Sequence, residues 1–551
     1  MRNIYFIICF FILATTQAQT TQDFIYFWKS GVLIEKRSIK TAYLDSITFK
    51  QPDNFYTNYN DLQVGLTSCY EGMQAPLSEE WAMTELRSDN TCMQFSTSTS
   101  TALNDLAYID QFYPSTTQTG IYNYWLKTYN NIKNCNTVLN ACGANYNAIT
   151  GVLEYQPVTI DVTTAQCKSV AAEASFIRAY HYFNLVRLYG GVFLIDEPVT
   201  AQQAETINRS TVAENYKLIE ADLLNAIANG KYDPYSAGSP DLGRANAWAA
   251  KALLAKVYLT LGRNAEASTL LNSVIASSGY SLQPTYSSVF AIYNEMNSEI
   301  LFSIRFKSGG LGMGNPLANL FAPFSGNAVI NGGGSSYNNP TRELTKVSSA
   351  YLSYIDPGLS RKDVNIGLYG TGNNYYIKKY ISPTALANDA ENDFPVIRYA
   401  DVLLMKAEAD GNTAGSLALI NLIRARVGLA ALTSTEITST ALYEKALAAE
   451  RRWEFAFENQ RWFDILRFTT TTTSLSASTD AFPNLKAQGV EYVMKKHFTN
   501  MYSTLYGTFS VLPITLNELL SNANPNRFLL PIPQYEIDSH SLITITQNPG
   551  Y

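Results

Sequence analysis

The chain of 551 residues is poor in charge, since Asp, Glu, Lys and Arg make up 16% of it and its net charge is −6. It contains no long run of lysine and arginine, so it lacks the basic stretch typical of proteins that bind the phosphates of nucleic acids. After the first 20 residues, no apolar run is long enough to span a bilayer. These absences argue against a nucleic-acid-binding protein and against a chain with several membrane-spanning helices.

Histidine is scarce too, with three residues in the whole chain. A catalytic base needs a positioned partner, and no carboxylate lies three or four residues from His181. The sequence has no HExxH, GxSxG or CxxC motif. The glycine-rich segment 309–315, GGLGMGN, does not follow a strand and open a helix, so we expect a loop there and not a dinucleotide site. We interpret His181 as a structural residue.

The first 20 residues read MRNIYFIICFFILATTQAQT. Arg2, an apolar stretch over residues 4–14 and a small residue at Ala18 form the pattern of an export signal, so we expect residues 1–18 to be a signal peptide. Cys9 lies inside this segment, which leaves five of the six cysteines. An exported protein can form a disulfide, but the spacing of these five does not define a pairing.

Helical periodicity begins near residue 60. Residues 172–189 form one helix-patterned run that stops at Gly190-Gly191. Residues 245–280 alternate small and large side chains around a turn at Gly262, a pattern that lets two antiparallel helices approach closely and resembles a tetratricopeptide (TPR) unit. A second, looser unit covers residues 401–429. We therefore expect helix pairs that stack on one another.

Residues 280–395 have a different composition, in which Gly, Asn, Ser and Pro dominate and aromatic residues are interleaved. Long ordered loops on a rigid frame often carry function. Residues 24–49 predict short strands around a turn at Ser30-Gly31. The expected fold is mainly α, and its parts are an N-terminal extension (22–49), a helical scaffold (about 60–280 and 396–468), a loop-rich ligand lobe (about 280–395) and a C-terminal segment (469–551).

A row of acids lies in residues 446–468. Glu450, Glu454 and Glu458 fall on one helical face, and paired carboxylates are the machinery of glycoside hydrolysis. Catalytic pairs, however, normally flank a cleft from separate elements. Four arginines are interleaved with these acids, namely Arg451, Arg452, Arg461 and Arg467. We therefore predict an ion-pair lattice that joins helices, with hydrolysis at Glu450 or Glu454 as the alternative.

A short polar cluster follows a helical stretch that contains Trp81. Within residues 85–90, ELRSDN, the side chains of Arg87, Asp89 and Asn90 supply donors and acceptors close together. Such a set suits hydroxyl-rich ligands. A capped turn is the alternative interpretation.

Five stretches, in this order, resemble the SusD/RagB family of outer-membrane nutrient-binding proteins. They are AEASFIRAYHYFNLVRLYGGVFL (172–194), RANAWAAKALLAKVYLTLGR (244–263), DFPVIRYADVLLMKAEA (393–409), ERRWEFAFENQRWFDILRF (450–468) and RFLLPIPQYEIDSHSLITITQNPGY (527–551). The resemblance covers about residues 53–551.

The resemblance implies a SusD-like fold, in which TPR-like helix pairs carry the loop-rich lobe. It also implies a non-enzymatic protein at the cell surface, in the outer membrane, that captures glycans or peptides and acts as a lid on a SusC-like TonB-dependent transporter. No cofactor or metal is implied. Family members are usually lipoproteins, but the residues around Cys9 do not form a lipobox. Anchoring through the transporter, or a different start of the gene, would account for this.

In the family, the loop after the first helix and the irregular lobe form the usual binding site. The aromatic rings would stack on sugar faces and the polar groups would hold hydroxyls. A peptide cargo with the same lid role, a peptide tail in the TPR groove and a glycoside hydrolase are the competing functions. The residues predicted to bind the ligand are Trp81, Arg87, Asp89, Asn90, Phe324, Tyr337, Asn338 and Tyr375.

Overall fold

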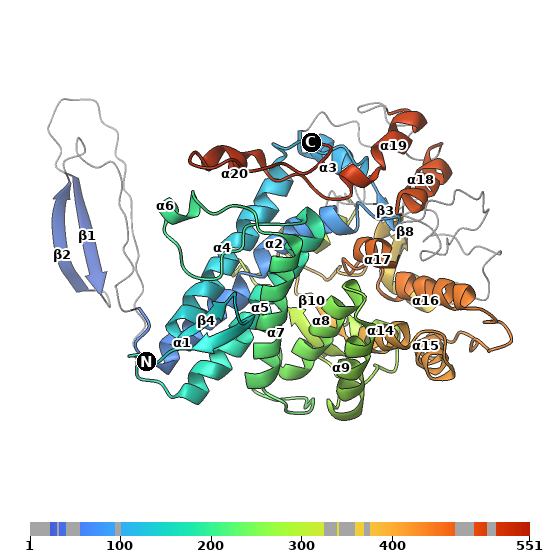
Figure 1. The fold of residues 1–551 in the computed structure, drawn as a ribbon, viewed down its shortest axis with the longest axis horizontal. Coiled ribbons are helices and arrows are strands. Elements are labelled where there is room, and N and C mark those ends of the chain that lie inside the picture. Colours follow the sequence, from blue (N-terminus) through green and yellow to red (C-terminus); the bar gives the residue numbers. More distant parts are fainter. Residues whose placement is uncertain are drawn as a thin grey trace. The chain divides into compact units, whose positions relative to one another are not determined.

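A computed structural model describes residues 23–29, 32–39, 55–93, 101–323, 339–340, 359–368, 375–468, 490–503 and 514–551 (Figure 1). The chain divides into two units, Met1–Thr57 and Asn58–Tyr551. In the first unit, β1 (Asp23–Lys29) and β2 (Val32–Ile39) pair antiparallel on either side of residues 30–31, where the sequence predicts a turn. The predicted signal peptide, residues 1–18, lies outside the described residues.

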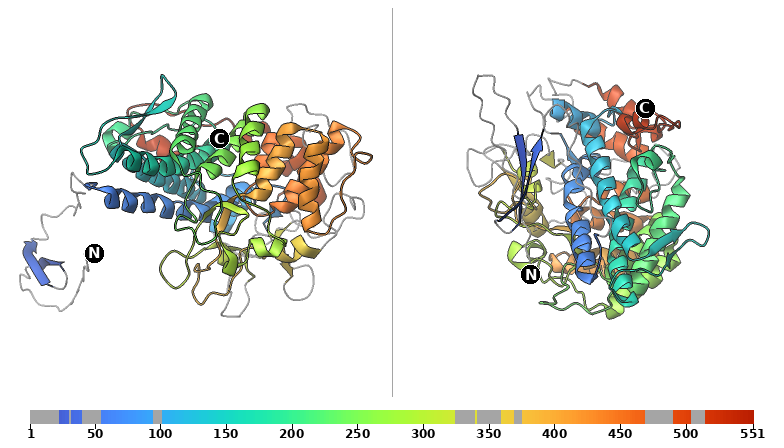
Figure 2. Two further views of the ribbon diagram at one scale, coloured as in Figure 1. Left: turned by 90° about the horizontal axis from the view of Figure 1, so that it is seen from below. Right: turned by 90° about the vertical axis from the view of Figure 1, so that its left-hand side faces the viewer.

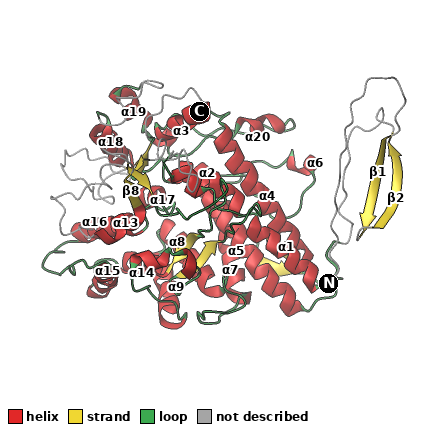
Figure 3. Ribbon diagram, turned by 180° about the vertical axis from the view of Figure 1, so that it is seen from behind, coloured by secondary structure: helices red, strands yellow, loops and turns green. Residues whose placement is uncertain are grey.

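The second unit is built mainly from helices, as the sequence predicted (Figure 3). Its first half contains α1 (Tyr59–Glu71), α2 (Gln74–Thr84), α3 (Thr101–Asp110), α4 (Thr119–Ala141), α5 (Thr164–Tyr189), α6 (Ala201–Ala204), α7 (Val212–Asn229), α8 (Ala247–Thr260) and α9 (Asn264–Ser277). Its second half contains α10 (Tyr286–Val289), η2 (Ile292–Asn294), α11 (Leu317–Phe321), α13 (Leu359–Asn365), α14 (Tyr399–Asp410), α15 (Ala414–Arg426), α16 (Thr440–Glu454), α17 (Arg461–Phe468), α18 (Val490–Met501), α19 (Leu516–Asn522), η7 (Pro525–Arg527) and α20 (Gln534–Ser539). Among the described residues, none of these helices has both the length and the apolar character needed to cross a membrane.

The strands of this unit are short and pair two by two. All four pairs are antiparallel, namely β3 (Thr91–Cys92) with β7 (Asn339–Pro340), β4 (Ala144–Asn147) with β5 (Val152–Tyr155), β6 (Ile300–Ile304) with β10 (Phe394–Arg398), and β8 (Ile366–Leu368) with β9 (Tyr375–Ile377).

Helix α5 lies at the centre of the helical scaffold and packs against α1, α4 and α7. It begins at a capping box formed by Thr163 and Gln166, which satisfies backbone N–H groups of the first turn. It ends at Gly190, whose φ of +76° favours glycine. Almost every side chain from Val170 to Tyr189 is buried. The helix is therefore a packing element.

His181 confirms this interpretation. It is buried in α5, and Asn131 Nδ2 donates a hydrogen bond to its Nε2 at 2.8 Å. Burial lowers the pKa of His181 to about 3. The imidazole is therefore neutral at physiological pH and faces protein instead of a cleft.

Both predicted helix–turn–helix units are present. Helices α8 and α9 form the first and α14 and α15 the second, with turns at Gly262 (φ +74°) and Gly411 (φ +68°). Helix α9 also packs against α14, so the two pairs lie side by side although a long segment separates them in sequence (Figure 2). Stacking of this kind buries the apolar faces that each helix pair would expose to solvent on its own.

The segment between these pairs is the loop-rich lobe, and its loops project from one side of the helices (Figure 2). The lobe begins near β6 and ends at β10, and these two buried strands pair with each other. The glycine-rich stretch is a loop, as predicted, and the backbone N–H groups of Gly309 and Gly310 donate to Asp389 Oδ2 at 2.8 and 3.0 Å.

The five cysteines after Cys9 are buried: Cys69, Cys92, Cys135, Cys142 and Cys167. They contribute to the core as small apolar groups. The disulfide that an exported chain could have formed is not made among them in this structure.

Candidate functional site

The predicted ion-pair lattice exists, and it is buried. Glu454 on α16 accepts a hydrogen bond from Arg398 Nη1 at 3.0 Å, forms a second with Arg426, and pairs with Arg361 at 3.3 Å. Burial alone would raise the pKa of Glu454, but the three arginines outweigh it and hold the pKa well below its usual range. Glu458 accepts two hydrogen bonds from Arg398, each at 2.8 Å.

The partners of the acid row differ from the interleaved arginines. Arg361, Arg398 and Arg426 lie on α13, at the end of β10 and at the end of α15, so they come from other parts of the chain. The interleaved arginines pair with a different set of acids, namely Asp401 and Asp464 for Arg451, Asp89 for Arg452 and Arg461, and Glu408 and Asp464 for Arg467. The lattice therefore ties α16 and α17 to the lobe, to the second helix pair and to the segment after α2.

This arrangement does not suit acid catalysis. A general acid of a glycosidase needs a carboxyl group whose pKa is raised and that reaches a substrate. Glu450 and Glu454 are buried, and both are paired with arginine. In the described part of the chain, both carboxylates are therefore engaged in ion pairs within the scaffold.

The polar cluster at residues 85–90 is also turned inward. Asp89 accepts hydrogen bonds from Arg461 Nε and Nη2 at 2.7 and 2.9 Å. Asn90 Oδ1 accepts from Arg452 Nε at 2.9 Å. Arg87 donates to the carbonyl of Arg527 at 2.6 Å. The structure brings these predicted residues together, and these hydrogen bonds join them to other parts of the protein. Arg87 Nε and Nη1 are buried and have no hydrogen-bond partner among the described residues.

The predicted aromatic residues have different positions. Trp81 is buried on α2, where its Nε1 donates to the carbonyl of Ser78 at 3.0 Å. Trp81, Arg87, Asp89 and Asn90 are therefore buried, and their role in ligand binding stays a prediction. Tyr375 is half-buried in β9, and its role in binding stays a prediction. Three further predicted residues, Phe324, Tyr337 and Asn338, lie outside the described residues.

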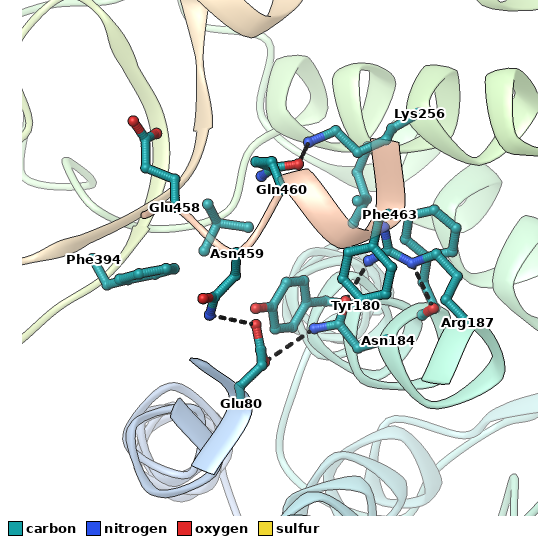
Figure 4. A pocket seen from close by; sticks show the side chains of 13 residues that line it. Glu80, Tyr180, Asn184, Arg187, Lys256, Phe394, Glu458, Asn459, Gln460 and Phe463 are labelled. Carbon is teal, nitrogen blue, oxygen red and sulfur yellow. Dashed lines mark hydrogen bonds between the residues drawn. The ribbon is translucent and has the colours of Figure 1, made fainter. Parts of the chain in front are cut away.

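A small interior cavity lies where α2, α5, α8 and the segment before α17 meet (Figure 4). Glu80 accepts hydrogen bonds there from Asn459 Nδ2 at 3.0 Å and Asn184 Nδ2 at 3.3 Å. Burial raises the pKa of Glu80. Arg187 lies between the rings of Phe183 and Phe463, with centroid distances of 3.7 and 3.5 Å.

The interior cavity has a volume of about 30 Å³. That volume holds a water molecule or two and excludes a sugar ring or a peptide. Perturbed carboxyl groups can mark functional sites, but here the polar groups bond to one another around a space too small for a sugar or a peptide. The cavity is a structural junction.

A much larger groove opens on the lobe, with a volume of about 840 Å³. We call it the lobe groove. Its size lies in the range of ligand sites. Its lining comes from residues 285–293, 363–364, 378–383, 392 and 426–428. The sequence indicated the lobe as the binding region but singled out none of these residues.

Two family models match the chain. The SusD family matches residues 346–551, and a family described as "Starch-binding associating with outer membrane" matches residues 43–259. SusD-like protein P25 of Formosa agariphila is 26% identical over 62% of this chain and 69% of its own length. A SusD-like protein of Bacteroides ovatus is 27% identical over 58% of this chain and 62% of its own length.

Solved structures share the fold. A laminarin-binding SusD-like protein superposes with a TM-score of 0.66 at 24% identity, covering 90% of this chain and 100% of its own. Surface glycan-binding protein A from Bacteroides fluxus gives a TM-score of 0.69 at 20% identity with the same coverage. The corresponding protein from Bacteroides thetaiotaomicron, solved in complex with laminarihexaose, gives 0.64 at 18% identity, covering 89% of this chain and 100% of its own.

Proposed function

Because this chain belongs to the SusD family, we propose that it is an exported, non-enzymatic protein that captures glycans at the cell surface and delivers them to a SusC-like TonB-dependent transporter in the outer membrane. The matches to two family models, one over each half of the chain, are the observation that carries this proposal. Its similarity to proteins whose names record laminarin or glycan binding supports glycan as the cargo.

The chemistry of the described residues supports binding without turnover. The acids that could have formed a catalytic pair are neutralised by arginines inside the scaffold. The lobe groove, in contrast, is open and has a mixed lining of aromatic, aliphatic and hydroxyl side chains. Such a lining holds a ligand through stacking and hydrogen bonds. Export is supported by the signal-peptide pattern of residues 1–18.

Affinity electrophoresis of the protein in gels that contain soluble polysaccharides tests the cargo. We expect slower migration in the presence of at least one glycan, relative to a gel without polysaccharide. Binding of a peptide mixture, together with failure of every polysaccharide, would replace the glycan by a peptide cargo. A shortened polysaccharide after incubation would contradict the non-enzymatic assignment.

Delivery to the transporter needs a separate test. We expect the protein to co-purify with a SusC-like barrel when the two are expressed in the same cell and extracted together from its outer membrane. A barrel that purifies without this protein under mild detergent would contradict the lid role and leave the binding role standing.

A further inference from the structure

The lobe groove lies where three parts of the chain meet. Residues 285–293 follow the first helix pair, residues 378–383 follow β9, and residues 426–428 end the second helix pair. The groove is therefore formed by segments of the lobe together with the end of α15, a helix that packs against α14. A site on such a frame is positioned before its ligand arrives, which reduces the entropy lost on binding.

Tyr293 is the most exposed aromatic residue that lines the groove. Its side chain is 89% exposed, and the neighbouring Ile292 is 40% exposed. Both lie in the short helix η2. A tyrosine in this setting offers a flat apolar face with a polar tip, which is suited to stacking against the apolar face of a sugar ring.

The buried part of the lining holds two polar atoms that lack a hydrogen-bond partner among the described residues, Asn392 Oδ1 and Arg426 Nε. Asn392 is 6% exposed and the side chain of Arg426 is 3% exposed. Buried polar atoms are nearly always paired, so these two atoms leave hydrogen-bonding capacity unused in residues that line the groove. Each atom has less than 1 Å² of accessible surface in this structure, so a ligand hydroxyl group reaches it only after the side chains around it rearrange. A hydroxyl group can donate and accept, and so it can satisfy either atom.

The charges of the groove balance. Lys379 donates to Glu458, and Arg426 pairs with Glu299 and Glu454, so both cations are compensated by the lattice. In the described lining, the other charged residues are Asp363 and Lys378, which carry one charge of each sign. A ligand with repeated carboxylate or sulfate groups would find no surplus of positive charge here.

We infer that the lobe groove binds a segment of an uncharged oligosaccharide, with a sugar ring stacked on Tyr293 and hydroxyl groups bonded to Asn392 Oδ1 and Arg426 Nε. This inference rests on the proposed function, because it names the site and the chemical class of the captured glycan. It separates this protein from a binder of acidic glycans, which would need unpaired arginine or lysine in the groove.

Isothermal titration calorimetry of the full protein tests the groove. The probes are laminarihexaose, xylohexaose and mannohexaose as uncharged sugars, and an alginate hexamer as the charged one. Tyr293→Ala removes the stacking surface, and we expect it to weaken binding of the accepted sugar about tenfold. Tyr535→Ala is the matched control, because Tyr535 is 57% exposed on α20 and does not line the groove.

Asn392→Ala provides a second test, in which a loss of sugar binding can be distinguished from a loss of folding. Because Asn392 Oδ1 has no partner in the described structure, we expect its removal to leave the melting temperature nearly unchanged while weakening sugar binding. Loss of affinity in both groove variants, with wild-type affinity in Tyr535→Ala, is the result we expect.

Three results would overturn the inference. If an uncharged sugar binds and neither groove variant weakens it, the site lies elsewhere and the proposed function stands. If the alginate hexamer alone binds, the uncharged class is wrong. If no hexasaccharide or soluble polysaccharide binds the wild-type protein, the proposed glycan capture fails, and the groove assignment fails with it.

Discussion

Replacing Glu454 by glutamine tests the ion-pair lattice at its centre. Glu454 is fully buried and pairs with Arg361, Arg398 and Arg426. Glutamine has nearly the same shape, so the substitution removes a charge without creating a cavity. Breaking a buried ion pair by removing one partner costs about 3–5 kcal/mol, because the opposite charge stays buried without compensation. We expect a loss of this size in the free energy of unfolding.

This loss in the free energy of unfolding lowers the melting temperature only modestly, because a large unit has a large entropy of unfolding. The entropy of unfolding of a domain scales with its length, and for about 500 residues it amounts to about 1 kcal/mol per degree. The melting temperature of Glu454→Gln should therefore fall by about 3–5 °C at pH 7. Differential scanning calorimetry measures this fall. Glu71→Gln is the control, because Glu71 is exposed at the end of α1 and its loss should change stability by less than about 0.5 kcal/mol.

The pH dependence of the same pair of proteins adds an independent reading. The pKa of Glu454 is held below its usual range by the arginines, so its contribution is present above the unfolded pKa of about 4.3 and is lost as pH falls toward the folded pKa. The gap in stability between wild type and Glu454→Gln should therefore narrow below about pH 4. An unchanged melting temperature at pH 7 would refute the lattice reasoning. Loss of a glycosidase activity with no loss of stability would favour the catalytic alternative.

Two further predictions concern buried groups whose pKa is shifted. Burial lowers the pKa of His181 to about 3, so the unfolded state binds more protons between about pH 6.5 and 3, and stability should fall by about 1.4 kcal/mol per unit as pH drops through this range. His181→Gln should flatten that part of the stability curve in urea titrations, and an unaltered slope would contradict the assignment. Burial raises the pKa of Glu85 to about 7, so its stabilising contribution is present below about pH 4.5 and is lost as pH rises to 7. Glu85→Gln should therefore raise the melting temperature at pH 8 relative to wild type, and a lower value at pH 8 would contradict the reasoning.

The helical scaffold could be predicted from the sequence because its signals are local. The helical pattern of α5 ends at a glycine pair, and Gly262 marks the turn between α8 and α9. These signals depend on residues within one or two turns, where periodicity and capping act. In the same way, composition predicted the loops that the structure describes within residues 280–395.

The role of the polar cluster at residues 85–90 could not be predicted. Arg87, Asp89 and Asn90 have the groups that a sugar site needs. Their partners, which are the carbonyl of Arg527 and the side chains of Arg461 and Arg452, all lie more than 360 residues away. A sequence without its fold does not distinguish a polar group that waits for a ligand from one that pairs with a distant arginine. The same applies to the acid row: its sequence predicted an ion-pair lattice but did not identify Arg361, Arg398 and Arg426 as the partners.

The lobe groove could not be predicted either, because no local sequence pattern marks the residues that line it. Tyr293 is one of 37 tyrosines, and nothing in its neighbours marks it as exposed. Its position in the groove is set by segments from three parts of the chain. Exposure and convergence are tertiary properties, so the sequence could indicate the lobe but not the residue.

The central claim is that this protein binds a glycan and leaves it intact. Calorimetric titration with the polysaccharide that retards the protein in affinity gels, followed by chromatography of the recovered polysaccharide, tests both halves in one sample. We expect saturable binding and an unchanged chain-length distribution after prolonged incubation. Shortened chains, or heat signals from peptides and none from any polysaccharide, would contradict it.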